Sequence, residues 1–314
     1  MKNVGDKPDS LRRARATASL YMPENCLALI RSGQTEKGDP LATARVAGIM
    51  AAKRTDEILP LCHPLPLQHA DVHFQVMADH VRVETEVQTI GPTGVEMEAL
   101  TAASVAALTL YDMLKPYTDQ TQLRLSDCQL LGKTGGKSHY RRELAFAVDA
   151  CVIVLSDTVA AGRGEDTAGR AVVEQLQKAG FDPIDYRVLP DEPEQLAAAV
   201  REQLERGTGL IVTVGGTGIG PRDRTVETVR PFITAELPGL METARAFGQR
   251  RMPYAMMSRG IGGMAGNTLI LTFPGSRKGA LESLAALLPG LIHIFEVCRD
   301  QPHPGGYGRE PAAG

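Results

Sequence analysis

The stretch GPTGVEMEALTAASVAALTLYDMLK, residues 91–115, decides how the first half of the chain folds. Apolar residues recur at helical spacing from Val95 to Leu114, after a glycine-rich start. Pro116 follows directly and cannot continue a helix interior. The stretch therefore predicts one long, mostly buried helix, around which the flanking segments must pack.

Both ends of this predicted helix carry charged residues. Glu96 and Glu98 stand in its first turn, and Asp112 and Lys115 in its last. At a rise of ~1.5 Å per residue, Glu98 and Asp112 lie roughly 20 Å apart, which is far for one small-molecule site. If both pairs serve one reaction, a neighbouring chain must supply the other end. The alternative is that these charges only complement the helix dipole.

The bulk composition indicates a two-domain protein of the cytoplasm. The 314 residues are 43% hydrophobic, contain no Trp and carry a formal charge of -3, which gives no reason to expect a nucleic acid or an acidic membrane as partner. The start of the chain has no apolar segment of the secretory kind. Five scattered cysteines without CxxC spacing are typical of reduced thiols, not of disulfides or a zinc site.

Helices and strands alternate in the first half after a polar start. Helical spacing predicts helices, and alternation of apolar and polar residues predicts strands, two of them joined in a hairpin at residues 78–80. This half is therefore α+β with an antiparallel sheet. The expected elements are helices at 26–31 and 41–54, a loop at 32–39 that carries Lys37, and strands at 72–76, 81–87 and 123–131.

Two further segments of this half have an unusual composition. The segment LCHPLPL, residues 61–67, holds Cys62 and His63 among prolines, which predicts a rigid turn. A fixed imidazole suits ligand contact or proton transfer, although for His63 considered alone a structural histidine is favoured. The segment GKTGGKS, residues 132–138, fails the nucleotide P-loop spacing at Leu131. It still predicts a loop whose amides and lysines cradle phosphate, with a surface turn as the alternative.

Together these motifs resemble the cyclic pyranopterin monophosphate synthases, the MoaC family, from about residue 4 to residue 138. The resemblance implies a ferredoxin-like fold, conversion of a cyclised dihydro-GTP intermediate into cyclic pyranopterin monophosphate with release of pyrophosphate, and no tightly bound organic cofactor. It also implies a trimer or hexamer with sites between subunits. By motif, the catalytic residues are Lys37, Asp112 and Lys115, and the substrate-binding residues are Cys62, His63, Glu96, Met97, Glu98, Lys133 and Lys137.

The second half repeats a pattern of strand, loop and helix, which predicts a doubly wound, mostly parallel sheet. In such sheets ligands bind at the carboxyl ends of the strands. The loops expected there carry glycines, hydroxyls and carboxylates, which suit phosphate and magnesium. A set of tight turns is the alternative for the glycines. These loops begin at Ser156, Pro190, Gly215 and Pro274, and the third of them, GGTGIGPRD, lacks the dinucleotide fingerprint.

The motifs SDTVAAGRGEDTAG, VTVGGTGIGPRDRTVE and LILTFPGSRKGALE resemble the MoaB and MogA family of molybdopterin-binding proteins, over about residues 146–297. The resemblance implies binding of molybdopterin and, in active members, its adenylylation with Mg-ATP. The implied catalytic carboxylates are Asp191 and Asp223, and the implied magnesium ligands are Asp157 and Asp166. The implied binding residues are Gly215, Gly216, Thr217, Gly218, Ser276 and Lys278.

The leading hypothesis is thus a bifunctional enzyme of molybdenum cofactor biosynthesis, with one domain at 1–142, a second at 143–300 and a flexible tail at 301–314. Its expected partners are the cyclised dihydro-GTP intermediate, molybdopterin and ATP. An alternative joins an active synthase to a non-catalytic molybdopterin-binding module. A nucleotide-hydrolysing switch is disfavoured because the Walker spacing is absent.

Overall fold

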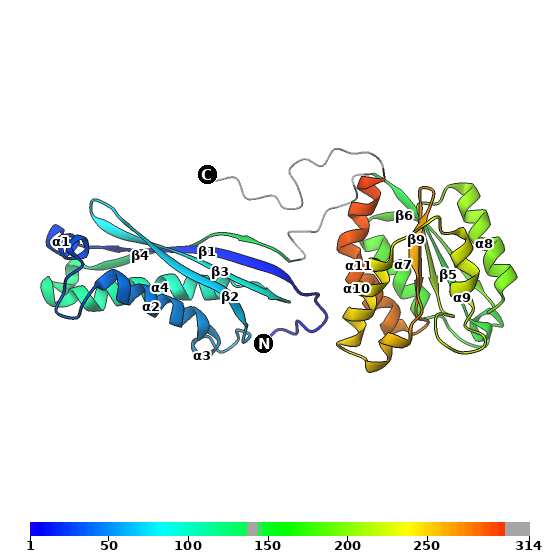
Figure 1. Cartoon of the computed structure of the whole chain (residues 1–314), viewed down its shortest axis with the longest axis horizontal. Helices are drawn as coiled ribbons and strands as arrows, with labels where there is room; N and C mark the ends of the chain where they lie inside the picture. Colours follow the sequence, from blue (N-terminus) through cyan, green and yellow to red (C-terminus); the bar gives the residue numbers. More distant parts are fainter. Residues whose placement is uncertain (137–143, 145, 299–314) are drawn as a thin grey trace. The chain divides into compact units, whose positions relative to one another are not determined.

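The computed structural model describes residues 1–136, 144 and 146–298, and these separate into two compact units (Figure 1). One unit holds the described residues up to 136, and the other holds those from 144 onward. Lys137, the predicted boundary between residues 142 and 143, and the predicted tail at 301–314 lie outside the described residues.

The N-terminal unit has the expected antiparallel α+β architecture. Its sheet has the order β2-β3-β1-β4, and all neighbouring strands are antiparallel. Helices follow β1 and β3, so the chain order is βαββαβ, the ferredoxin-like arrangement. The elements are β1 (Ser10–Tyr21), α1 (Glu24–Ser32), α2 (Pro40–Lys53), α3 (Thr55–Ile58), β2 (Leu67–Val76), β3 (His80–Gly91), α4 (Glu96–Leu114) and β4 (Arg124–Thr134).

Strand β1 corrects the sequence-based expectation, because residues 10–21 lie in what was expected to be only a polar start. They form a central strand that pairs with both β3 and β4. Its inward positions hold Ala14, Ala16 and Ala18, all buried, while arginines occupy positions between them. Alanine is a weak strand signal, and this is why the alternation does not stand out in the sequence.

Small residues on α4 explain the alanines of β1. The buried face of α4 is lined mainly by alanines, so the helix packs closely on the sheet, together with α2 (Figure 1). Among the described residues, one helical stretch, Glu96–Tyr117, is long and apolar enough to cross a bilayer, and half of its apolar window is buried in the protein. A bent pair of segments, Arg277–Leu288 and Gly290–Val297, passes that test only when both are counted together.

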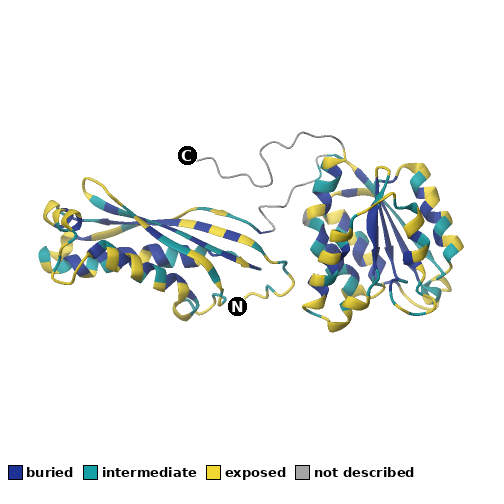
Figure 2. Cartoon of the chain, viewed as in Figure 1, coloured by how far each residue is buried: buried dark blue, intermediate teal, exposed yellow. Residues whose placement is uncertain are grey.

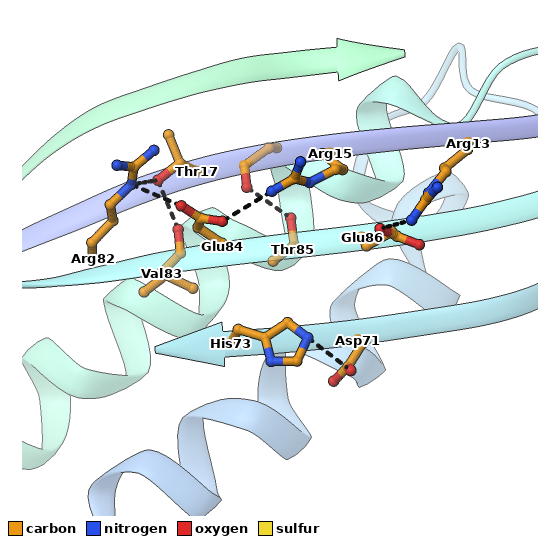
Figure 3. A network of polar contacts seen from close by, with 11 residues as sticks. Arg13, Arg15, Thr17, Asp71, His73, Arg82, Val83, Glu84, Thr85 and Glu86 are labelled. Atoms are coloured by element: carbon orange, nitrogen blue, oxygen red, sulfur yellow. Dashed lines mark hydrogen bonds and ion pairs between the residues drawn. The ribbon is translucent and has the colours of Figure 1, made fainter. Parts of the chain in front are cut away.

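Charged side chains cover the opposite face of the N-terminal sheet (Figure 3). Arg13 pairs with Glu86 at 2.6 Å, and Arg15 pairs with Glu84 at 3.2 Å. Arg82 approaches Glu84 at 3.2 Å from the same strand. One face of the sheet is therefore aliphatic and the other ionic, which is the alternation of an antiparallel sheet covered by helices on one side.

The segment expected as a phosphate loop is partly strand. β4 extends to Thr134, so Gly132 and Lys133 belong to the sheet, and Ala14 pairs with Lys133. The turn after β4 needs glycine: Gly135 has a φ of 92°, and a Cβ there would lie 1.9 Å from the carbonyl oxygen of Leu11. Part of this glycine pattern therefore serves the close approach of β4 to β1.

The C-terminal unit contains the expected doubly wound sheet. Its order is β6-β5-β7-β10-β9-β8, in which the first four strands are parallel and the last two antiparallel. The strands are β5 (Val148–Leu155), β6 (Phe181–Leu189), β7 (Leu210–Val214), β8 (Ala235–Glu236), β9 (Gly262–Ala265) and β10 (Thr268–Phe273). The main helices are α7 (Ala168–Lys178), α8 (Pro193–Arg206), α9 (Thr225–Val229), α10 (Pro238–Gln249) and α11 (Arg277–Val297), and a short helix α6 (Asp157–Ala160) follows β5.

Helices cover both faces of this sheet, and its central strands are buried (Figure 2). On β5, Val152 and Val154 pack with α7, α10 and α11, whereas Cys151 and Ile153 pack with α8 and α9. Burial on both sides explains the nearly continuous apolar run of this strand. The polar loops at the ends of the strands are consequently the places where this unit can present chemistry.

Candidate active sites

Three predicted catalytic residues of the N-terminal unit meet at the C-terminal end of α4. Lys37 Nζ lies 2.7 Å from Asp112 Oδ2, and Lys115 Nζ lies 2.8 Å from Asp112 Oδ1. The loop that carries Lys37 is held near this end because the backbone N–H of Glu36 donates to the Tyr117 hydroxyl at 2.7 Å. One carboxylate thus fixes two ammonium groups on the surface.

The pairing of these groups sets their protonation. Hydrogen bonds from Lys115 and Lys37 lower the pKa of Asp112 to about 2. The same contact with Asp112 raises the pKa of Lys115. Because its pKa is raised, Lys115 is a protonated group at neutral pH. It can donate a proton or bind an anion, and another group must accept a proton first.

The other end of α4 gathers a second set of predicted residues. Lys133 Nζ contacts Glu96 Oε1 at 2.7 Å. Although burial favours the neutral acid, this hydrogen bond lowers the pKa of Glu96. Glu98 is 4% exposed, and burial raises its pKa to about 7, with the neighbouring Glu96 and Asp56 carboxylates acting in the same direction. Two carboxylates only two residues apart therefore differ in protonation near neutral pH, as expected of an acid–base pair.

The proline-rich turn lies near this second set. Burial raises the pKa of the Cys62 thiol, and the negative charges of Glu98 and Asp56 raise it further. His63 Nε2 lies 2.8 Å from the Lys2 carbonyl oxygen, so its ring is held against the start of the chain. Met97 projects outward between the two glutamates and is 43% exposed.

Arg12 is a residue of this region that the sequence did not single out. Its guanidinium donates to the carbonyl oxygens of Gly91 at 3.1 Å and Pro92 at 3.3 Å, and it contributes to lowering the pKa of Glu96. It is 9% exposed although it occupies a strand expected to be a polar start. The sequence signal that could have identified Arg12 is its place at an inward-facing position of a segment in which buried and exposed residues alternate.

The two sets of residues are not brought together within one chain. Glu98 lies in the first turn of α4 and Asp112 in the last, and the helix between them is continuous. A separation of fourteen residues corresponds to ~20 Å along a helix. One chain therefore presents two half-sites at opposite ends of the same helix.

The C-terminal unit differs, because its predicted residues, apart from Asp157, line one cavity of about 780 Å³. The cavity lies at the carboxyl ends of β5, β7 and β10, where the sheet topology places a ligand. It is lined by residues from all four predicted loops, among them Ser156, Asp191, Gly215, Gly216, Thr217, Gly218, Asp223, Ser276 and Lys278.

The glycine-rich turn after β7 forms one wall of this cavity. Gly216 has a φ of 63°, and a Cβ there would lie 2.2 Å from Thr225 Oγ1, so the turn admits only glycine at this position. Asp223 Oδ2 accepts the backbone N–H of Gly220 at 2.8 Å. Arg259 donates to the carbonyl oxygens of Gly218 and Asp223, both at 2.6 Å. The turn is therefore a fixed cradle.

The loops after β5 and β6 are tied to each other by two aspartates. Asp157 Oδ1 accepts the backbone N–H of Asp191 at 3.0 Å, and Asp191 Oδ2 accepts that of Asp157 at 3.1 Å. Arg222 contacts the other oxygen of Asp157 at 2.7 Å. This reciprocal arrangement holds Asp191 at the cavity wall.

Asp166 caps α7. Its two oxygens accept three backbone N–H groups, those of residues 168–170, at 2.9 to 3.0 Å, and the Tyr186 hydroxyl at 2.7 Å. Burial favours the neutral acid, yet these donors lower the pKa of Asp166. Within the described part of the chain, no group of three or more His, Cys, Asp or Glu side chains could hold a metal ion.

Several cavity residues lie outside the predicted set. They come from α10, α11 and the segment before β9, which pack beside the strand ends. Only the helical spacing of these segments was visible in the sequence, and it does not say which side faces a ligand. The residues include Met241, Arg245, Tyr254, Met257, Glu282 and Ser283.

The whole chain is similar to curated proteins of two-domain composition. A molybdenum cofactor biosynthesis bifunctional protein from Chlorobaculum tepidum is 40% identical over 303 residues, which is 96% of this chain and 96% of that protein. The chain belongs to this family of bifunctional proteins. A second member, from Synechococcus elongatus, is 37% identical over 316 residues and covers 96% of this chain and 98% of its own length.

Each half of this bifunctional protein also matches separately. The MoaC family model matches residues 1–136, and the model described as "Probable molybdopterin binding domain" matches residues 151–293. A cyclic pyranopterin monophosphate synthase from Heliobacterium modesticaldum is 52% identical over 146 residues, covering 46% of this chain and 91% of the relative. The crystal structure of MoaB from Thermus thermophilus is 42% identical, with a TM-score of 0.47, and covers 49% of this chain and 98% of that one.

Proposed function

We propose that the N-terminal unit converts a cyclised dihydro-GTP intermediate into cyclic pyranopterin monophosphate and pyrophosphate, and that the C-terminal unit binds molybdopterin and adenylylates it with Mg-ATP. The observation that carries the first assignment is the pair of half-sites on α4, together with the 52% identical synthase. The observation that carries the second is the cavity on which four polar loops converge.

In the first reaction we assign proton transfer to groups at both ends of α4. Protonated Lys115, held by Asp112 beside Lys37, supplies a proton or stabilises developing negative charge. Glu98, whose pKa is about 7, can exchange a proton at neutral pH. Because these groups sit at opposite ends of one helix, we propose that a second copy of the chain completes each site, and that His63, Lys133 and Lys137 bind the triphosphate.

In the second reaction we assign the amides of the glycine-rich turn to phosphate and Asp191 and Asp223 to magnesium. Each aspartate uses Oδ2 to accept a backbone N–H, and within the described residues its Oδ1 accepts none. Mg²⁺ binds through one or two carboxylates, substrate phosphates and water, and bound Mg²⁺ would neutralise phosphate charge. Asp157 and Asp166, expected as magnesium ligands, are engaged by amides, Arg222 and Tyr186, so we assign them to positioning the loops.

Adenylylation tests the second assignment directly. Purified protein is incubated with molybdopterin and Mg-ATP, and pyrophosphate and adenylated pterin are measured. We expect Asp223→Asn to lower the rate by about 100-fold or more, because a carboxylate that binds a catalytic metal is lost. The matched control is Asp182→Asn, an exposed aspartate at the start of β6, far along the strand from its carboxyl end.

The control should keep its activity. Product formed by the wild-type and control proteins but lost in Asp223→Asn would support two enzymes in one chain. Tight pterin binding by the wild-type protein without product would contradict the adenylylation and leave a synthase joined to a molybdopterin-binding module.

A further inference from the structure

A glutamate in the wall of the C-terminal cavity has no hydrogen-bond donor. Glu282 lies on α11, lines the cavity, and its side chain is 13% exposed. Its Oε1 is buried and accepts no hydrogen bond. Within the described residues its charged neighbour is Lys278, whose Nζ remains 3.9 Å from Oε1.

Three other carboxylates of the cavity wall each accept at least one hydrogen bond from the fold. Asp166 receives three backbone N–H groups and a tyrosine hydroxyl, while Asp191 and Asp223 each receive one backbone N–H. A buried carboxylate without donors is unfavourable, because it has lost water without gaining a replacement. Only Oε1 of Glu282 is buried in this way. The other oxygen, Oε2, is accessible and also accepts no hydrogen bond within the described residues, so it is the acceptor position that the folded chain leaves open at the cavity.

The cations of the cavity are poorly placed to fill this position. Arg245 also lines the cavity, but its guanidinium donates to the carbonyl oxygens of Gly260 at 3.0 Å and Ser258 at 3.4 Å. The Lys278 side chain is 67% exposed and starts one helical turn before Glu282. A bound molecule that offers N–H groups would supply the missing donors.

We propose that Glu282 binds the 2-amino and N3–H edge of the pterin and so selects the pterin ring within this cavity. This proposal rests on the proposed function of the C-terminal unit as a molybdopterin-binding domain. A pterin presents two adjacent N–H donors at this edge, and a carboxylate accepts both. The corresponding edge of adenine places one donor beside an acceptor nitrogen, which a carboxylate cannot satisfy. The ring of ATP therefore binds elsewhere in the cavity.

The test combines a change in the protein with a change in the ligand. The probes are a 6-(phosphooxymethyl)pterin and the matching lumazine, which carries oxygen in place of the 2-amino group. Affinities are measured by equilibrium binding to the full chain, for the wild-type protein, Glu282→Gln and the control Glu242→Gln. Glu242 is exposed on α10 and does not line the cavity.

We expect the wild-type protein and the control to bind the pterin about 10-fold or more tightly than the lumazine. Glu282→Gln should weaken pterin binding about 10- to 100-fold, because a charged acceptor is replaced by an amide. The same change should leave lumazine affinity nearly unaltered, so that the preference for pterin disappears. Affinity for Mg-ATP should remain within about 2-fold in all three proteins, since adenine does not use this edge.

Thermal unfolding without ligand separates recognition from a structural role. Glu282→Gln should unfold at the same or a higher temperature than the wild-type protein, because it removes a buried charge that lacks a donor. A lower unfolding temperature together with unchanged pterin preference would overturn the proposal. Equal pterin affinity in Glu282→Gln and wild type would overturn the Glu282 assignment alone. Absence of pterin binding by the wild-type protein would overturn it together with the proposed function of the C-terminal unit.

Discussion

The two units of this chain place their candidate residues in opposite ways. In the C-terminal unit four loops meet at one cavity of about 780 Å³, so a single chain brings these candidate residues together at one site. In the N-terminal unit the candidates divide into a set around Asp112 and a set around Glu96 and Glu98, at opposite ends of α4. A parallel sheet directs successive loops to one edge, whereas one long helix on an antiparallel sheet separates its ends.

This difference has a functional consequence. The residues of the C-terminal cavity come from one unit, and we expect phosphate to bind there to backbone amides held by glycine turns. The N-terminal half-sites rest on long charged side chains at the surface, and we expect them to work only when two chains meet. Substitutions should therefore affect the two reactions independently, and they should differ in whether a second chain can compensate.

The largest effect is expected from Lys115→Ala. Loss of a proton donor and anion-binding group should lower cyclic pyranopterin monophosphate formation by about 1,000-fold or more. The fold should persist because the Lys115 side chain is 43% exposed. The synthase rate and the adenylylation rate are measured on the same preparation, with Lys53→Ala, an exposed lysine of α2, as control. A synthase rate close to that of wild type would remove Lys115 from the catalytic set.

Gly216→Ala tests whether the glycine-rich turn is a rigid wall of the C-terminal cavity. A methyl group there would meet Thr225 Oγ1 at 2.2 Å, at a φ of 63°, so the turn must move. We expect the KM for molybdopterin to rise about 10-fold and the free energy of unfolding to fall by about 1 to 3 kcal/mol, with synthase activity unchanged. Gly239→Ala is the control, because a Cβ there meets no atom within 4 Å. An unaltered KM and unfolding temperature would show that the turn is not a rigid cradle.

The architecture of both units follows from the sequence wherever long apolar patterns exist. The predicted α4 agrees with the structure to within a residue or two, because its apolar pattern is long. β1 is not predicted from the sequence, because its core face includes Ala14, Ala16 and Ala18 and alanine contributes little to a strand pattern. The short strand β9 begins with two glycines, and at the second, Gly263, a Cβ would lie 2.5 Å from the carbonyl oxygen of Ala235 in β8. The periodicity of the sequence does not reveal such a close approach.

The sequence predicts which residues belong to the candidate sites, but it does not predict how those residues are arranged in space. Motif and resemblance pointed to Lys37, Asp112 and Lys115, which the structure brings together. They did not point to Glu282, since a lysine followed by a glutamate four residues later in a helix is typical of an exposed ion pair. Only packing reveals that Glu282 lines a cavity and that its Oε1 is buried without a hydrogen-bond donor.

The smallest expected effect concerns the protonation of Glu98. Burial raises its pKa from an ordinary value of 4.5 to about 7. Between these values the folded chain keeps a proton that the unfolded chain releases, so the free energy of unfolding falls as the pH rises. We expect this fall to be about 1 kcal/mol between pH 5 and pH 7.

Glu98→Gln should remove this part of the pH dependence and should be the more stable protein at pH 7. Chemical denaturation at pH 5, 6 and 7 checks this, with the exposed Glu57→Gln of α3 as control. An identical pH dependence in Glu98→Gln and wild type would show that Glu98 is not buried as a neutral acid.

Complementation between inactive variants tests the contrast between the two units most directly. In the first mixture, Lys115→Ala and Glu98→Gln chains are unfolded, combined in equal amounts, refolded and assayed for synthase activity. In the second mixture, Asp191→Asn and Asp223→Asn chains are treated in the same way and assayed for adenylylation. If each N-terminal site takes one end of α4 from each of two chains, random mixing should restore about one quarter of the wild-type synthase rate. The adenylylation pair should restore none, because its site lies within one chain. Verified mixed oligomers without synthase activity, or recovery of adenylylation, would contradict this account.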